Sequence, residues 1–169
     1  MIWTSADSKT RMQQTASPKP AGMQRIGMVE RSTTGSSMPG VSMPLRSDID
    51  VLKARQEGKA LAASLRFSTS ELTTIATAIS EIARNTVLYA TKGQIMLDIV
   101  QKGTKRGLQI VTKDQGPGIP DLALAMQDGY TTSHGLGIGL PGSKRLMDEF
   151  EITSEVGKGT TIIMKKWER

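Results

Sequence analysis

Two glycine-rich motifs, one of them headed by a carboxylate, contain the residues of this chain best suited to bind a ligand. The first motif consists of Asp114, Gly116 and Gly118. The second places glycine at alternate positions, at Gly135, Gly137 and Gly139. Glycine allows a backbone to turn through positive φ or to approach a ligand closely, and backbone N–H groups that lead into a helix bind anions. Because an ionised aspartate only accepts hydrogen bonds, Asp114 suits the exocyclic amine of adenine. The pattern predicts a nucleotide site whose second motif holds phosphates.

Two other nucleotide motifs are excluded by their surroundings. The glycines at 137, 139 and 142 satisfy G-x-G-x-x-G, but the polar run 130–134 precedes them where the dinucleotide fingerprint requires a hydrophobic strand. Gly157 and Lys158 resemble the end of a P-loop, but Gly159 follows where a Ser or Thr is required. Neither a dinucleotide fold nor a P-loop is predicted.

Three polar residues precede these motifs at intervals of four: Glu81, Asn85 and Tyr89. In a helix this spacing places them in one line, along the edge of the apolar stripe. The amide oxygen of Asn85 is a suitable ligand for Mg²⁺, which retains waters and takes further ligands from phosphates. Glu81 is placed to orient or deprotonate an attacking hydroxyl. For Tyr89, stacking on adenine and packing beside the core both stay open. For Thr160, bonding on the adenine side and filling a strand also stay open.

In combination, the motifs resemble the N, G1, G2 and G3 boxes of the ATPase superfamily of gyrase, Hsp90, histidine kinases and MutL. Glu81-x-x-x-Asn85 corresponds to the N box, and Gly157-x-Gly159-Thr160 to the G3 box. Residues 78–85, 114–121 and 139–150 are further similar to stressosome switch kinases of the RsbT type, and this likeness covers residues 41 to 169. The resemblance implies the Bergerat, or histidine-kinase-like ATPase, fold.

The resemblance also implies roles for individual residues. Glu81 is expected to be the general base, and Asn85 the ligand of Mg²⁺. The residues expected to bind ATP are Asn85, Tyr89, Asp114, Gly116, Gly118, Thr132, Ser133, Gly135, Leu136, Gly137, Ile138, Gly139, Leu140 and Thr160. Residues 128–134 are expected to form a lid over the nucleotide. His134 stands where the switch kinases have glycine, and we expect its bulk to affect lid closure.

Composition narrows the class of protein. The 169 residues include no cysteine and one histidine, so neither a disulfide nor a cluster of histidine or thiolate metal ligands is predicted. No apolar run is long enough for a membrane span, and residues 1–30 lack the apolar core of a secretory signal. The net charge of +6 is shared evenly between residues 1–40 and the remainder. With few aromatic residues, this charge does not predict nucleic-acid binding. We expect a soluble, cytoplasmic protein.

The chain divides near residue 40. Residues 1–40 are rich in Ser, Thr, Gly, Pro, Gln and Met and show no period, which predicts either a disordered N-terminal extension or a start site assigned too far upstream. Residues 41–169 are expected to form the domain. Expected helices span 48–65, 68–90, one or two turns within 121–127, and 141–150. Expected strands span 41–45, a run from 93, 108–113, 150–154 and 160–166.

These elements predict an α+β domain, a two-layer α/β sandwich with helices on one face of a mixed, mainly antiparallel sheet. In the helix from residue 48, the residues expected near one face are Ile49, Leu52, Ala60 and Ala63. In the helix from residue 68, Ser68 and Glu71 form a capping box.

The expected activity follows from what the domain lacks. No transducer domain accompanies it, and the single histidine lies in the lid, so a gyrase-type machine and a histidine kinase acting in cis are not predicted. A serine/threonine kinase acting on a partner remains. The resemblance implies a STAS-domain antagonist as its substrate and a PP2C-type phosphatase as its activated target. Two alternatives stay open: an anti-sigma factor kinase of the RsbW or SpoIIAB type, which sequesters a sigma factor, and a nucleotide-responsive binding module without turnover.

Overall fold

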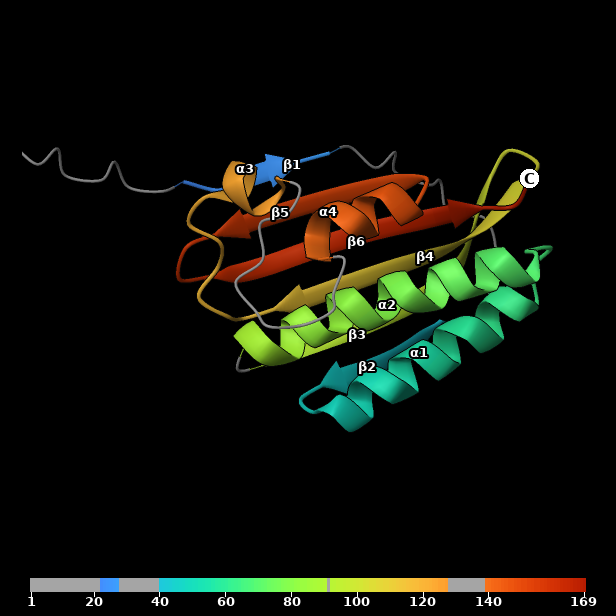
Figure 1. Ribbon diagram of the computed structural model, residues 1–169, viewed down its shortest axis with the longest axis horizontal. Helices are drawn as coiled ribbons and strands as arrows, with labels where there is room; N and C mark the ends of the chain where they lie inside the picture. Colours follow the sequence, from blue (N-terminus) through green and yellow to red (C-terminus); the bar gives the residue numbers. More distant parts are fainter. Residues whose placement is uncertain (1–21, 28–39, 91, 128–138) are drawn as a thin grey trace, which may run out of the picture.

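The protein is a two-layer sandwich in which helices cover one face of a six-stranded sheet (Figure 1). The computed structural model describes residues 22–27, 40–90, 92–127 and 139–169. The strands are β1 Gln24–Ile26, β2 Val41–Leu45, β3 Gly93–Lys102, β4 Lys105–Asp114, β5 Glu149–Glu155 and β6 Gly159–Trp167. The helices are α1 Asp48–Ala63, α2 Thr69–Tyr89, α3 Leu122–Ala125 and α4 Gly139–Leu146. The predicted α+β fold class is confirmed.

The strands follow the order β1-β5-β6-β4-β3-β2, and each of the pairings between described strands is antiparallel. The expectation of a mixed sheet is therefore wrong for this part of the chain. Strands β3 and β4 form a long hairpin, and β6 pairs with the other edge of β4. The inward side chains of these three neighbouring strands form the floor of the core. Among them, Leu97, Ile110 and Met164 are fully buried.

Helix α2 lies over this floor (Figure 1). It carries the polar line that begins at Glu81. At its start, the Ser68 hydroxyl accepts from the Glu71 N–H at 3.3 Å, and the Glu71 carboxylate accepts from the Ser68 N–H at 2.8 Å. Its apolar residues recur at intervals of three and four, and among them Ile75, Ile79 and Ile82 are completely buried. The predicted capping box and buried stripe are confirmed.

The buried face of α1 differs from the expected one. The four residues that were expected near one face are all exposed, with Ile49 at 63% and Leu52 at 56%. The buried positions are Val51, Ala54, Gly58 and Ala62. A Cβ on Gly58 would overlap the tip of the Ile79 side chain, so small residues are what let α1 lie against α2. The close contact between the two helices, and not the hydrophobicity of the larger side chains, selects the buried face here.

The boundary between α4 and β5 also differs from the prediction. Helix α4 ends at Leu146 instead of continuing to Phe150, which is a buried residue of β5. Asp148 accounts for the early end, because its carboxylate accepts from the Trp167 N–H at 2.8 Å and from Lys166 Nζ at 2.9 Å. These contacts with β6 start the strand pairing where the sequence pattern suggested another helical turn.

Part of the predicted disordered extension is ordered. Gln24–Ile26 form β1, which pairs with β5 at one edge of the sheet, so the prediction for residues 1–40 is wrong at these positions. Ile26 packs against the core, and Arg25 forms an ion pair with Glu151 at 2.7 Å. None of the helices in the described ranges is long and apolar enough to cross a membrane.

Candidate functional site

Asp114, the last residue of β4, is fixed by the backbone of the loop that follows it and by the backbone of β6. Its Oδ1 accepts from the Gly116 N–H at 2.8 Å and from the Thr160 N–H at 3.1 Å. Its other oxygen, Oδ2, makes no hydrogen bond with any residue of the described ranges. The carboxylate is thus oriented through one oxygen, and the second is available to a ligand that donates a hydrogen bond.

The first glycine motif packs backbone to backbone on the turn between β5 and β6. Gly118 has φ of 72°, and a Cβ there would overlap the Glu155 carbonyl oxygen. In the reverse direction, a Cβ on Gly159 at the start of β6 would overlap the carbonyl oxygen of Asp114 in the first motif. The Gly157 N–H donates to the Pro117 carbonyl at 2.8 Å. The G1 and G3 motifs therefore form one unit in space, which depends on glycine at both contact points.

Gly118→Ala is expected to disrupt this unit, because alanine would meet both a positive φ and the Glu155 backbone. We expect nucleotide affinity to fall at least about tenfold and stability to fall by about 1–3 kcal/mol. Gly103→Ala is the matched control, since Gly103 lies far from the site and has φ of 61°, but a Cβ there would meet no atom within 4 Å. Fluorescence titration with a nucleotide and urea unfolding measure the two effects. Equal losses of affinity in the two variants would contradict this account.

The buried hydroxyls of Ser154 and Thr160 also hold the unit formed by the G1 and G3 motifs. Ser154 Oγ lies 2.9 Å from Thr160 Oγ1 and accepts from the Ile119 N–H at 2.9 Å. The Thr160 hydroxyl therefore belongs to an internal network, and its contact with adenine stays a prediction. Sequence reasoning missed Ser154. The available signal was a polar residue at an inward position of β5, after the buried Phe150 and Ile152.

The Glu81 side chain, on α2, reaches the first residue of α4, Gly139, which is also the last glycine of the second motif. Its Oε2 accepts from the Gly139 N–H at 3.4 Å, a long contact, and its Oε1 lies 3.8 Å from Arg84. The Glu81 side chain is 13% exposed. Ser143 fixes the first turn of α4 by donating to the Gly139 carbonyl at 2.9 Å. The structure thus places a carboxylate beside Gly139, the described glycine of the motif that is predicted to hold phosphates.

The C-terminal end of α2 lies against the first motif. A Cβ on Gly116 would come within 2.9 Å of the Tyr89 carbonyl oxygen, so the loop after Asp114 passes directly under this helix end. Asn85 is half-buried one turn before it, and the Tyr89 side chain is 48% exposed. Gly139 and Gly116, one described glycine of each motif, thus lie beside Glu81 and beneath Tyr89, and Asn85 lies between these two residues along the helix. The roles of the three side chains stay predictions.

Six predicted ATP-binding residues lie outside the described residues, together with His134: Thr132, Ser133, Gly135, Leu136, Gly137 and Ile138. Their roles stay predictions. Leu140, in the first turn of α4, packs partly buried against the hydrophobic core.

The groups that are described suit ATP. Asp114 offers an acceptor for an amine, and Gly116 and Gly118 let the loop after it pack tightly on the end of α2 and on the turn between β5 and β6, which holds that acceptor in place. The amide of Asn85 is an oxygen ligand of the kind that Mg²⁺ uses beside phosphates.

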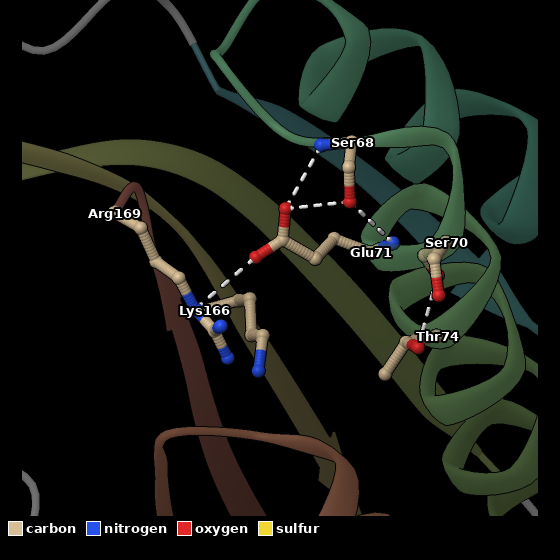
Figure 2. A pocket seen from close by; sticks show the side chains of 6 residues that line it. All are labelled: Ser68, Ser70, Glu71, Thr74, Lys166 and Arg169. Atoms are coloured by element: carbon tan, nitrogen blue, oxygen red, sulfur yellow. Dashed lines mark hydrogen bonds and ion pairs between the residues drawn. The ribbon is translucent and has the colours of Figure 1, made fainter.

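A separate hollow of about 350 Å³ lies near the N-terminal end of α2 (Figure 2). Figure 2 shows the Glu71 carboxylate between Ser68 and Arg169, whose Nε is 3.6 Å from Glu71 Oε1. Hydrogen bonds from the Ser68 backbone and hydroxyl, together with the Arg169 charge, lower the pKa of Glu71 below its usual value. No predicted nucleotide ligand lines this hollow, which is therefore distinct from the candidate site.

Comparison with known proteins identifies the family of the chain. The model of the histidine kinase-like ATPase domain family matches residues 44–166. The serine/threonine-protein kinase RsbT of Bacillus subtilis is 52% identical over 125 residues, which cover 74% of this chain and 94% of RsbT. The anti-sigma F factor of Geobacillus stearothermophilus is 35% identical over 121 residues, covering 67% of this chain and 81% of that factor.

A solved structure shows the same fold. The RsbU and RsbW domains of a Mycobacterium tuberculosis protein align with a TM-score of 0.55 and 17% identity, over 78% of this chain and 34% of that longer one. From the family match and the identity to RsbT, the chain belongs to the histidine kinase-like ATPase family and, within it, to the serine/threonine-protein kinases of the RsbT type.

Proposed function

We propose that this protein transfers the γ-phosphoryl group of Mg·ATP to a Ser or Thr hydroxyl of a separate partner protein. The observation that carries the proposal is the contact between Glu81 and Gly139, which puts a carboxylate next to the predicted phosphate-binding backbone. A base in this position can accept the proton of a hydroxyl that attacks in line with the γ-phosphorus. ATP binding itself follows from membership of the family.

The described residues would each have a separate role in binding ATP or in the transfer. Asp114 Oδ2 would accept from the adenine amine, while Oδ1 stays bonded to backbone. The Gly139 N–H would exchange its long contact with Glu81 for a phosphate oxygen, which frees the carboxylate for the attacking hydroxyl. Asn85 would hold Mg²⁺, which neutralises phosphate charge when bound. Most of the catalysis would then come from positioning and charge, as is general for phosphoryl transfer.

The proposed substrate is a STAS-domain antagonist, and the proposed activated target is a PP2C-type phosphatase, in a partner-switching module of the stressosome kind. The support is the 52% identity to RsbT across nearly its whole length. We expect the protein to act in the cytoplasm, without a nucleic-acid or membrane partner.

An anti-sigma factor kinase is the second candidate, because the anti-sigma F factor of Geobacillus stearothermophilus is 35% identical to the chain over 121 residues. The higher identity to RsbT favours the first candidate over this one. A binding module without turnover is less favoured, since Glu81 is held beside Gly139, where a base is needed.

The candidates differ in what the purified full-length protein does with radiolabelled Mg·ATP and candidate partners. Label on a Ser or Thr of a STAS protein, followed by capture of a PP2C-type phosphatase, supports the first candidate. Label on the STAS protein together with capture of a sigma factor supports the second. Nucleotide binding without any transfer supports the binding module and contradicts the kinase.

A further inference from the structure

Strand β1 lies outside the part of the chain that matches the family, since the match begins at residue 44. It nonetheless adds an edge strand to the domain and pairs in register with β5, Gln24 facing Ser154. Figure 1 shows β1 beside α3, the short helix that follows the first glycine motif. A segment from outside the matched region therefore reaches the neighbourhood of the nucleotide site.

The Gln24 side chain makes three hydrogen bonds to the backbone that leads into α3. Its amide nitrogen donates to the Pro120 carbonyl at 2.8 Å and to the Ile119 carbonyl at 3.3 Å. Its amide oxygen accepts from the Leu122 N–H at 3.0 Å. An amide, which both donates and accepts, is the type of side chain that this set of backbone partners requires.

The segment 119–122 is continuous with the nucleotide site. It follows Gly118 directly, and the Ile119 N–H donates to Ser154 Oγ, which also contacts the Thr160 hydroxyl and the Gly159 carbonyl. The Thr160 N–H in turn donates to Asp114. Gln24 and Ser154, which face each other across the two strands, thus hold the same loop, and hydrogen bonds connect that loop to the predicted adenine acceptor.

We propose that Gln24 is a positioning residue for the nucleotide site, which holds the loop after Gly118 in its ATP-binding conformation. The inference rests on the proposed role of Asp114 and Gly118 in binding ATP. A loop without regular structure loses backbone freedom when it is ordered, and a contact that orders it beforehand removes this cost from binding. Residues outside the family domain thereby raise the affinity of this chain for nucleotide.

Gln24→Ala in the full-length protein tests the inference through the Kd for ATP, measured by calorimetry. We expect the Kd to rise about fivefold to tenfold, because the loop must then be ordered on binding. Gln24→Glu keeps an acceptor for the Leu122 N–H but turns a carboxylate oxygen toward two carbonyls, so its Kd should rise at least as far. Hydrogen exchange at the Leu122 amide should speed up in both variants.

One variant within β1 and one of the residue that precedes it separate positioning from simple support of the fold. Arg25→Gln removes the ion pair with Glu151 and should lower Tm without changing the Kd. Met23→Ala changes a side chain that is 68% exposed and should change neither. A wild-type Kd in folded Gln24→Ala, or an equal rise in Arg25→Gln, would overturn the inference. Wild-type protein that binds ATP but phosphorylates no partner would refute the proposed function and leave this inference standing.

Discussion

Glu81→Gln is expected to reduce phosphoryl transfer to the partner by at least about a hundredfold, while the Kd for ATP stays within about twofold of wild type. Glutamine retains a carbonyl oxygen that can accept from the Gly139 N–H, so the start of α4 keeps its contact. The amide cannot take up a proton from the attacking hydroxyl. A loss of transfer without a loss of binding is the result that a general base requires.

Arg84→Gln controls for the ion pair of Glu81. Arg84 lies 3.8 Å from Glu81 and is half exposed, so this pair contributes little and its removal should change transfer less than about threefold. Single-turnover transfer of labelled phosphate measures both variants. If Glu81→Gln transferred phosphate at the wild-type rate, the assignment of the base would be wrong.

The second large effect is expected for Asp114→Asn, which should weaken ATP binding by about a hundredfold. Asparagine can keep the bonds from the Gly116 and Thr160 N–H groups through its carbonyl oxygen. Its amide nitrogen then takes the place of Oδ2, so that two hydrogen-bond donors, this amide and the adenine amine, face each other. The loss of a charged hydrogen bond is worth about 1.5–3 kcal/mol, which corresponds to roughly tenfold to a hundredfold in affinity, and the opposed donors add to it.

Asp121→Asn is the matched control for this substitution. It makes the same chemical change on the same loop, but asparagine caps a helix as well as aspartate does, so the bond to the Leu124 N–H is retained. Its Kd for ATP should equal that of the wild type in a calorimetric titration. If Asp114→Asn also bound ATP normally, adenine recognition would have to lie elsewhere.

The elements with a strong local pattern were predictable from the sequence. Helix α2 combines a capping box at Ser68 with apolar residues at helical spacing, and both signals are local. The buried face of α1 was not predictable in the same way, because Gly58 and its small neighbours are selected by contact with Ile79 on another helix. Strand β1 has three residues, too few for a period to show, and its pairing partner β5 is far away in the sequence.

In the candidate site, too, local patterns were predictable and contacts between distant segments were not. The glycine motifs and the line from Glu81 to Tyr89 follow from residue types and spacing alone. Spacing does not reveal which backbone each glycine meets, and the contacts of Gly118 with Glu155 and of Gly159 with Asp114 join segments distant in sequence. Ser154 and Gln24 were missed for the same reason, since their hydrogen bonds to residues 119–122 exist only after the strands have paired.

The central claim, that this chain phosphorylates a protein in trans, is tested most directly by mapping phosphate on a purified STAS-domain partner. The partner would be incubated with Mg·ATP and either the full-length protein or its Glu81→Gln variant, and its peptides analysed by mass spectrometry. The account predicts a phosphorylated Ser or Thr that appears with the wild type and is absent with the variant. An unmodified partner, or equal phosphorylation by the two proteins, would contradict it.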